Sequence, residues 1–271
     1  MNVLLLGCGV IGVATGRLLV NAGHQVFGIR RHPDGTDAGF PISAGDAADP
    51  ALYPRIAARF PAVDAVVCAA NPGVRRGSGS GREKDNGLVA SARLICATYP
   101  QARLIYTSTT SVYGDAKGGP VHEESAIDGT PEAQALIAIE QPFLQHRNAL
   151  ILRATALVGP TRTFTRDRLR AANGGELSVK GDLDRPFSYL HEADLADLCV
   201  HALLGNMGCG ILNAASPQRI TVRAYYAALS ESAGITLQLK SDGATVPSRW
   251  IDAACLHATV GPQYPWRGML D

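Results

Sequence analysis

The first thirty-one residues restrict the fold of this chain more than any other stretch. An apolar run, Val3 to Leu6, breaks at the glycine-containing turn Gly7 to Gly12, and apolar residues then recur at helical spacing. A second apolar run, Gln25 to Ile29, follows. This order of strand, glycine turn, helix and strand has the length that a parallel crossover unit requires. The sequence therefore predicts a parallel sheet whose first strand lies at the N-terminus.

The glycines of the turn have different predicted tasks. Gly7 would form the tight turn, Gly9 would let a pyrophosphate approach, and Gly12 would let the helix pack on the strand. Backbone N–H groups at the helix start, around Val10 and Ile11, would bind the phosphates. A glycine turn alone is weak evidence, but here the flanking strand and helix are both present. We expect a dinucleotide-binding site; a purely structural turn is the alternative.

The end of the second strand indicates which dinucleotide binds. Proteins that prefer NAD usually carry Asp or Glu about twenty residues past the glycines, where it bonds the ribose. This chain has Arg30, Arg31 and His32 there, and its first acid is Asp34. Two guanidinium groups suit a 2′-phosphate. We predict NADP(H) as the favoured cofactor and leave NAD(H) open, since the arginines could also be solvated surface residues.

Further cofactor contacts are expected after the third and fourth strands. Residues 41–45 form a short strand candidate, and Asp46 and Ala47 follow it, in the loop that lies near the adenine in a doubly wound sheet. Residues 63–70 are a continuous apolar run, as expected of a buried parallel strand. This run ends in small residues that would let the backbone approach the cofactor: Ala69, Ala70 and Asn71.

Residues 73–82 have the composition of a linker but are no domain boundary, because the strand and helix pattern resumes directly after them. A helix over residues 83–99 leads to a strand over residues 102–107. We interpret the segment as a flap beside the cofactor, whose Arg75, Arg76 and Arg82 could meet an anion. A surface loop without a ligand is an equal alternative.

Composition excludes several classes of protein. A net charge of +1 gives no field for nucleic acid, and no segment approaches the length that spans a bilayer. The N-terminus is the first core strand and shows no signal peptide. The six cysteines are scattered without a Cys-x-x-Cys pair, so we expect reduced thiols, no zinc site and a cytoplasmic protein.

A run of hydroxyl residues, Thr107 to Ser111, leads into Val112-Tyr113-Gly114. Together with the G-x-G-x-x-G turn, this makes the chain resemble an extended short-chain dehydrogenase/reductase, of the epimerase/dehydratase family. Further matches span nearly the whole chain: Asn86-Gly87, Leu152-Arg153-Ala154, Val158-Gly159-Pro160, His191-Glu192-Ala193-Asp194-Leu195 and Gly210-Ile211-Leu212-Asn213. The resemblance is closest to short, atypical members.

The resemblance implies hydride transfer at a nicotinamide, with three side chains at work. A Ser or Thr holds the substrate oxygen, a Tyr transfers the proton, and a Lys four residues later lowers the pKa of the Tyr. Thr109 occupies the Ser/Thr position, although it could simply satisfy a strand-end backbone group. The chain departs from the pattern at the other two positions, where Glu132 replaces Tyr and Leu136 replaces Lys.

A literal Tyr-x-x-x-Lys occurs at Tyr113 and Lys117, but the following Gly-Gly-Pro indicates a loop, so we interpret it as coincidence. Tyr113 could still line the pocket. Thr109 would then orient a carbonyl while Tyr113, Glu132 or a bound water supplies the proton. An acid such as Glu132, next to Pro131, is equally typical of an ordinary helix start.

Two groups of charged residues lie after the sheet pattern ends. Arg162, Arg166 and Arg170 would share a helix face and could bind a phosphate or carboxylate, although a solvated face is commoner. His191, Asp194, Asp197 and His201 have near-helical spacing, but we expect a structural helix start and no metal.

We therefore predict an α/β fold: a doubly wound (Rossmann) parallel sheet with a small C-terminal substrate lobe. Residues 1–160 would form the dinucleotide-binding core and residues 161–271 mostly the lobe, with 191–215 returning to the core. The favoured function is an NADP(H)-dependent oxidoreductase for a small polar metabolite, with an anionic one allowed. A nucleotide-sugar epimerase/dehydratase with tightly held NAD(P) and a non-catalytic NADP sensor are the alternatives. A homodimer is left open, and neither nucleic acid nor membrane is an expected partner.

Overall fold

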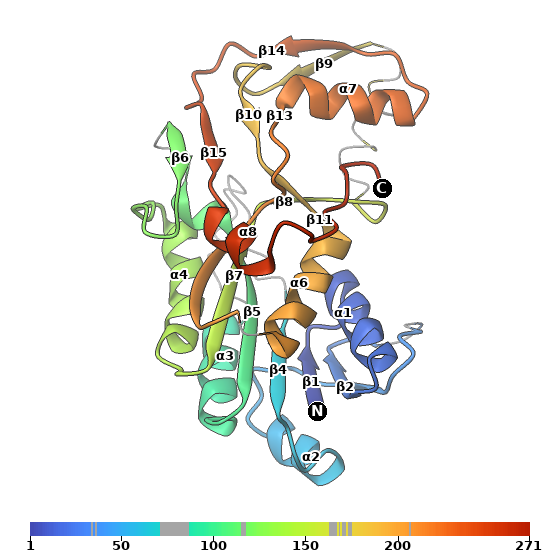
Figure 1. Cartoon of the computed structure of the whole chain (residues 1–271), viewed down its shortest axis with the longest axis vertical. Helices are drawn as coiled ribbons and strands as arrows, with labels where there is room; N and C mark the ends of the chain where they lie inside the picture. The colour runs from blue at the N-terminus through green and yellow to red at the C-terminus, as the bar shows by residue number, and fades with distance from the viewer. Residues whose placement is uncertain are drawn as a thin grey trace.

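The computed structural model describes residues 1–33, 35, 37–70, 87–114, 118–162, 167, 169, 172, 175–205 and 207–271. A parallel sheet runs through the middle of this part of the chain (Figure 1). In spatial order, its strands are β12 (Gly210–Ala214), β7 (Ala149–Ala154), β5 (Arg103–Thr109), β4 (Ala65–Cys68), β1 (Asn2–Leu6), β2 (Gln25–Arg30) and β3 (Ile42–Ala44).

Helices cover both faces of this sheet because its central strands are apolar on both sides. Side chains of β1 alternate between the faces: Leu5 packs in one cluster with Leu198, and Leu4 packs in the other with Ile95. The first face is covered by α1 (Val10–Asn21) and α6 (Glu192–Leu204), and the second by α2 (Leu52–Arg59), α3 (Leu88–Thr98) and α4 (Pro131–Leu144). The predicted doubly wound fold is confirmed.

The strands that follow β1 in the sequence lie on both sides of it in the sheet. It first runs outward through β2 and β3, then returns to β4 and continues through β5 and β7 to β12. The strand order thus reverses between β1 and β4, and ligands of such sheets bind at the carboxyl ends of the strands beside this point. The predicted strands after the glycine turn lie where the apolar runs indicated. The predicted helix over 83–99 is shorter, because α3 begins at Leu88, after its left-handed N-cap Gly87, and ends at Thr98.

A smaller region lies above the sheet in Figure 1. Its core packs α7 (Val222–Ser232) against short strands through Leu177, Val222 and Tyr226. Four strand pairs belong to this region or join it to the sheet: β9 (Glu176–Val179) with β14 (Gln238–Ser241), β10 (Pro186–Phe187) with β13 (Ile220–Thr221), β8 (Ala156–Val158) with β11 (Tyr189–His191), and β6 (Gly119–Val121) with β15 (Arg249–Ile251).

Two late elements lie at the sheet: α6 packs against α1, and β12 pairs with β7. The last helix, α8 (Ala254–Val260), lies close to β12. Within the described ranges, no helix combines the length and apolar character needed to cross a membrane.

Candidate functional site

A cavity of about 700 Å³ opens at the carboxyl ends of the central strands, beside the point where the strand order reverses. It extends from the β2 and β3 side of the sheet to the β5 and β7 side. Its described lining is Gly7, Cys8, Gly9, Val10, Ile11, Ile29, Arg30, Arg31, His32, Gly45, Asp46, Ala47, Ala69, Ala70, Gly87, Leu88, Ser91, Thr107, Ser108, Thr109, Ser111, Ala154, Thr155, Leu157, Arg162 and Leu195.

The glycine turn forms one wall of this cavity. Gly7 has φ +91°, and a Cβ on it would come 2.5 Å from the backbone N of Ala70. A Cβ on Gly12, behind the turn, would come 2.5 Å from the carbonyl oxygen of Gly7, so this glycine lets α1 approach the turn. Gly9 differs, since a Cβ there would meet no described atom within 4 Å. The turn is therefore closed toward the protein and open at Gly9 toward the cavity.

The start of α1 has the properties of a phosphate site. Its N-cap residue is Gly9, which provides no side-chain acceptor, and its first turn holds no acidic residue. The first N–H groups of a helix have no partner within the helix, and the helix dipole favours an anion there. Val10 and Ile11 of this turn line the cavity. The residues present therefore fit the diphosphate of a dinucleotide.

The β2 and β3 end of the cavity carries the cationic residues that the sequence singled out. Arg30 ends β2 and is half-buried, and Arg31 and His32 follow it and are exposed. Asp46 and Ala47 line the same end. Asp46 Oδ1 accepts a hydrogen bond from the backbone N of Ala48 at 3.0 Å, which shapes this loop. The four predicted contacts of this end, Arg30, Arg31, Asp46 and Ala47, thus all line the cavity, and His32 lines it beside them.

The ends of β4 and β5 line the middle of the cavity. Ala69 and Ala70 follow β4, and Thr107 lies on β5, where its hydroxyl is 3.5 Å from the carbonyl oxygen of Cys68. Asn71, like the predicted flap with its three arginines, lies outside the described residues. Three of the four predicted contacts of the middle section therefore line the cavity.

Thr109 and Ser111 bring two hydroxyl groups to the β5 end of the cavity. The Thr109 hydroxyl donates to Ser111 Oγ at 3.1 Å and accepts from the Ser111 backbone N at 3.2 Å. Thr109 thereby caps the short 3₁₀ helix η1 (Thr110–Tyr113). Thr109 thus satisfies a backbone group, as the alternative interpretation held, and it also lines the cavity, while its catalytic role stays a prediction.

Tyr113 lies in a buried network instead of the cavity lining. Its hydroxyl donates to Asn213 Oδ1 and accepts from Arg153 Nη1, each at 2.8 Å, and the residue is only 4% exposed. Arg153 also bonds Glu140 through Nε at 3.1 Å and Nη2 at 2.6 Å. Burial raises the pKa of the Tyr113 phenol, against the opposing effect of the Arg153 hydrogen bond. The contacts of Tyr113 therefore favour a structural role over proton transfer.

Helix α4 carries Glu132 and Leu136, the two residues that we expect at the Tyr and Lys positions of the pattern. Thr130 caps this helix through the Ala133 N–H, Pro131 and Glu132 form its first turn, and Glu132 is partly exposed. Glu132 is absent from the described lining of the cavity. Leu136 is 3% exposed and packs against Val112. The side chains of this helix thus contribute packing where a Lys was expected, and the catalytic use of Glu132 stays a prediction.

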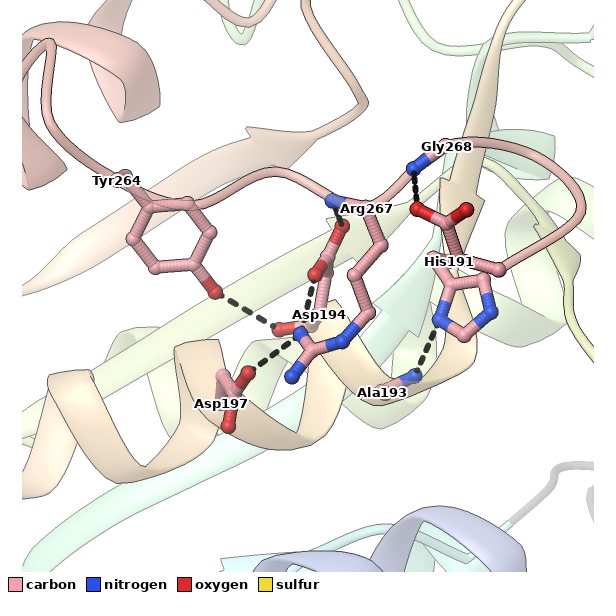
Figure 2. Close-up of polar contacts among 8 residues, drawn as sticks. His191, Ala193, Asp194, Asp197, Tyr264, Arg267 and Gly268 are labelled. Atoms are coloured by element: carbon pink, nitrogen blue, oxygen red, sulfur yellow. Dashed lines mark hydrogen bonds and ion pairs between the residues drawn. The ribbon is translucent and has the colours of Figure 1, made fainter.

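The charged residues at the start of α6, for which the sequence predicted a structural role, connect the C-terminal segment to this helix (Figure 2). Arg267 Nη1 bonds Asp194 Oδ1 and Asp197 Oδ2, each at 2.6 Å, and the hydroxyl of Tyr264 donates to the Asp194 carbonyl at 3.3 Å. Burial raises the pKa of the Asp194 carboxyl, although the Arg267 bonds oppose this. His191 Nδ1 accepts from the Ala193 N–H and so caps α6. His191, Asp194 and Asp197 thus form a helix start and a docking point, and the His201 ring packs edge-on against Tyr264.

Cys8, the cysteine in the cavity lining, does not have the properties of a catalytic nucleophile. Cys8 lies in the glycine turn and is fully buried, and burial raises the pKa of its thiol to about 12. A thiol of this kind is protonated at neutral pH and therefore a poor nucleophile. All six cysteines are free, as the sequence predicted.

Sequence reasoning missed several lining residues that come from distant segments. Thr155 and Leu157 follow β7, and Leu195 belongs to α6. Glu192 was regarded only as part of a helix start, yet its carboxylate lies 3.1 Å from Nε of Arg162. Its position one residue after the helix cap was the available signal, because an acid there can serve a neighbouring loop as well as the helix.

Comparisons with known proteins agree with this geometry. The family model described as "NAD dependent epimerase/dehydratase family" matches residues 3–213. A search of curated proteins finds no match. The Bordetella bronchiseptica enzyme WbmG, solved with NAD and UDP, is similar with a TM-score of 0.78 and 18% identity, over 99% of this chain and 90% of that one.

Two further solved structures have the same fold. MoeE5 in complex with UDP-glucuronic acid and NAD has a TM-score of 0.79 and 23% identity, over 99% of this chain and 94% of that one. dTDP-glucose 4,6-dehydratase from Bacillus anthracis, solved with NAD, has a TM-score of 0.74 and 17% identity, over 97% of this chain and 92% of that one.

Proposed function

Because this chain belongs to the NAD-dependent epimerase/dehydratase family, we propose that it holds a nicotinamide dinucleotide in the large cavity and acts on a nucleotide sugar. One observation carries the proposal: the same cavity includes the glycine turn at β1 and the hydroxyl groups at the end of β5. The cofactor and the reacting part of a substrate can therefore meet in it. WbmG and MoeE5, which share the fold, hold NAD together with UDP or a UDP-sugar, and this supports the substrate class.

The chain's own groups would bind the cofactor along the strand ends. The first N–H groups of α1 would hold the diphosphate, and Asp46 and Ala47 would contact the adenine end. Ala69 and Ala70 leave the backbone after β4 accessible to the middle of the cofactor. In this arrangement Thr109, at the β5 end of the cavity, would lie beside the nicotinamide end of the cofactor.

The proposed cofactor form is NADP(H). Arg30 and Arg31 line the cavity at the end of β2, where an NAD-binding protein would usually have a carboxylate. Guanidinium groups bind a phosphate through paired hydrogen bonds, which an unphosphorylated ribose cannot match. NAD(H) is the alternative, since the similar solved proteins named above hold NAD.

When bound, the nicotinamide supplies a carbon that accepts and returns a hydride. Thr109 would turn its hydroxyl hydrogen from Ser111 Oγ to the substrate oxygen. The Ser111 backbone N–H, which donates to the Thr109 hydroxyl oxygen at 3.2 Å, would hold the side chain in place. Since the Tyr113 hydroxyl is engaged by Arg153 and Asn213, we assign the proton transfer to a water beside Thr109 and Ser111. Glu132 is the remaining protein candidate for this proton.

The test is whether the purified protein retains a nicotinamide cofactor and converts UDP-sugars. Epimerisation or dehydration returns the hydride, so turnover should proceed without net cofactor consumption, with the product identified by NMR. Thr109→Val, which keeps the branched shape and removes the hydroxyl, should lower turnover and leave cofactor binding unchanged. Stoichiometric oxidation of NADPH with a carbonyl substrate would replace this proposal with an NADP(H)-dependent oxidoreductase for a small polar metabolite.

A non-catalytic, cofactor-sensing protein is the second candidate. It is favoured by Leu136, which is buried among apolar side chains at the position where the family uses a Lys. Leucine can neither bond a ribose nor lower the pKa of a neighbour. Tight cofactor binding without turnover of any UDP-sugar or carbonyl compound, together with a redox-dependent change of oligomer, would favour the sensor.

A further inference from the structure

A buried carboxylate beside the cavity holds one arginine in place. Glu192 begins α6 and is 5% exposed. Its Oε1 accepts a hydrogen bond from the Thr161 backbone N at 3.0 Å, and its Oε2 accepts one from the Thr161 hydroxyl. The same Oε2 lies 3.1 Å from Nε of Arg162. Because Glu192 occupies the first turn of α6, the helix dipole also stabilises its negative charge.

The loop that carries the arginine is shaped around this carboxylate. Gly159 has φ +137°, and a Cβ on it would come 2.6 Å from Cγ of Glu192. Only glycine therefore allows the chain after β8 to close around the Glu192 side chain. The position from which the Arg162 side chain extends is therefore fixed by the contacts among Gly159, Thr161 and Glu192.

Arg162 lines the cavity, and its terminal guanidinium nitrogens can donate hydrogen bonds to a ligand there. It belongs to the lining, and its side chain keeps 38% of its surface exposed. Its buried Nε forms an ion pair with Glu192 without making a hydrogen bond, and among the described residues no hydrogen bond from a terminal nitrogen of Arg162 is found. A guanidinium held in this way presents a planar pair of donors that matches the oxygens of a phosphate or carboxylate.

The position of Arg162 in the cavity separates it from the proposed cofactor phosphates. It follows β8, which continues from β7, on the opposite side of the central strand β1 from Arg30 and Arg31 at the end of β2. The cavity is therefore cationic on both sides, and Thr109 at the end of β5 lies on the Arg162 side. An anion at Arg162 would belong to the substrate.

We propose that Arg162 binds an oxyanion of the substrate and that Glu192 is the positioning residue that holds Arg162 ready. This inference rests on the proposed function, since it identifies the chemical group of the substrate that binds on the β5 and β7 side of the same cavity. The oxyanion is either the diphosphate of a nucleotide sugar or a carboxylate on the sugar itself, and these two share the same chemistry.

The experiment measures ligand affinity by calorimetry on protein saturated with its nicotinamide cofactor. UDP, UDP-glucose and UDP-glucuronic acid are titrated into the wild type, Arg162→Gln and the matched control Arg223→Gln. Arg223 pairs with Asp184 through Nε at 2.8 Å and is absent from the described lining of the cavity. Arg162→Gln should weaken binding about 30-fold, the loss expected for a charged hydrogen-bond pair, and Arg223→Gln should not.

The pattern of losses identifies the anion. Equal weakening for all three ligands indicates the diphosphate, whereas weakening for UDP-glucuronic acid alone indicates the sugar carboxylate. Wild-type affinity in Arg162→Gln for all three ligands overturns the inference. If the wild type binds none of them, the proposed substrate class fails. The inference is then tested by thermal stabilisation with inorganic pyrophosphate and with glucuronate, and a stabilisation that is absent, or equal in the wild type and Arg162→Gln, overturns it.

Glu192→Gln tests the positioning role separately. Glutamine keeps the size of the side chain and an oxygen for Thr161, but it lacks the charge that attracts Arg162. Substrate affinity should fall about tenfold while cofactor affinity and unfolding temperature stay close to those of the wild type. An equal loss of cofactor affinity would show that Glu192 acts only as a structural residue of α6 and would contradict the positioning role.

Discussion

The two sides of the large cavity are built in different ways. On the β1 and β2 side, backbone groups of a glycine turn form the wall, and Gly7 has a conformation that favours glycine. On the β5 and β7 side, the wall consists of side chains from separate segments, among them Thr109, Thr155 and Arg162. The first side depends on a local backbone shape, and the second depends on which distant residues the fold brings together. Each prediction below breaks or sharpens this contrast.

The largest effect on stability is expected at the buried ion pair beneath the β5 and β7 side of the cavity, which we call the reactive side because we propose that the substrate reacts there. Arg153→Met removes the cationic partner of Glu140, whose side chain is fully buried, and takes one of two hydrogen bonds from the Tyr113 hydroxyl. Ser108 still donates to Glu140 Oε1, so the carboxylate stays buried without its counter-charge. Breaking a buried pair from one side typically destabilises a protein by about 3–5 kcal/mol. Chemical denaturation of Arg153→Met should show a loss of this size. A loss below about 1 kcal/mol, the range of an exposed pair, would mean that the network does not hold β5 to β7.

The glycine turn should separate stability from binding. Gly9→Ala places a methyl group where no described atom lies within 4 Å, so the unfolding temperature should hardly change. The methyl would occupy space that the diphosphate needs, and cofactor affinity should fall about 100-fold. Gly7→Ala should lose both stability and binding, because its Cβ would collide with Ala70. Unchanged cofactor affinity in Gly9→Ala would place the diphosphate elsewhere.

The hydroxyl groups of the reactive side should affect turnover alone. Thr109→Val should lower kcat about 30-fold, since a hydrogen bond to a developing charge is lost, and cofactor affinity should be unchanged. Ser111→Ala is the matched comparison, and its effect should be smaller because Ser111 acts through Thr109. Turnover that is insensitive to both changes would remove these residues from the mechanism.

The smallest predicted effect concerns the choice between the two cofactors. Replacing Arg30 and Arg31 by Gln should reduce the preference for NADP over NAD about tenfold, the contribution expected from paired hydrogen bonds to one phosphate. Parallel titrations of both nucleotides measure it. A wild-type protein that binds NAD as tightly as NADP would contradict the role given to these arginines.

The sequence was most informative where a local backbone conformation decides the structure. The predicted strands and the glycine turn rest on short-range rules, and Gly7 and Gly12 have the close backbone contacts that the pattern required. Two predicted cofactor contacts lie at strand ends, since Arg30 is the last residue of β2 and Asp46 lies two residues after β3. Their place in the cavity lining could therefore be predicted as well.

The reactive side could be predicted only in part. Tyr113 was a reasonable candidate because it follows the hydroxyl run, but its partners Arg153 and Asn213 lie 40 and 100 residues away in the sequence. Likewise, Glu192 approaches Arg162 across 30 residues (192 − 162) through the pairing of β8 with β11. Such contacts depend on tertiary packing, which no local pattern encodes.

The central claim is that the cavity at the strand ends binds a nicotinamide dinucleotide through the start of α1. Isothermal titration of the purified chain with NADPH, NADP⁺, NADH and NAD⁺, in parallel with Gly9→Ala, tests this most directly. The account predicts saturable binding at one site per chain, tightest for the phosphorylated pair, and a marked loss in a stably folded Gly9→Ala. Absence of saturable binding of all four nucleotides to the wild type would contradict it.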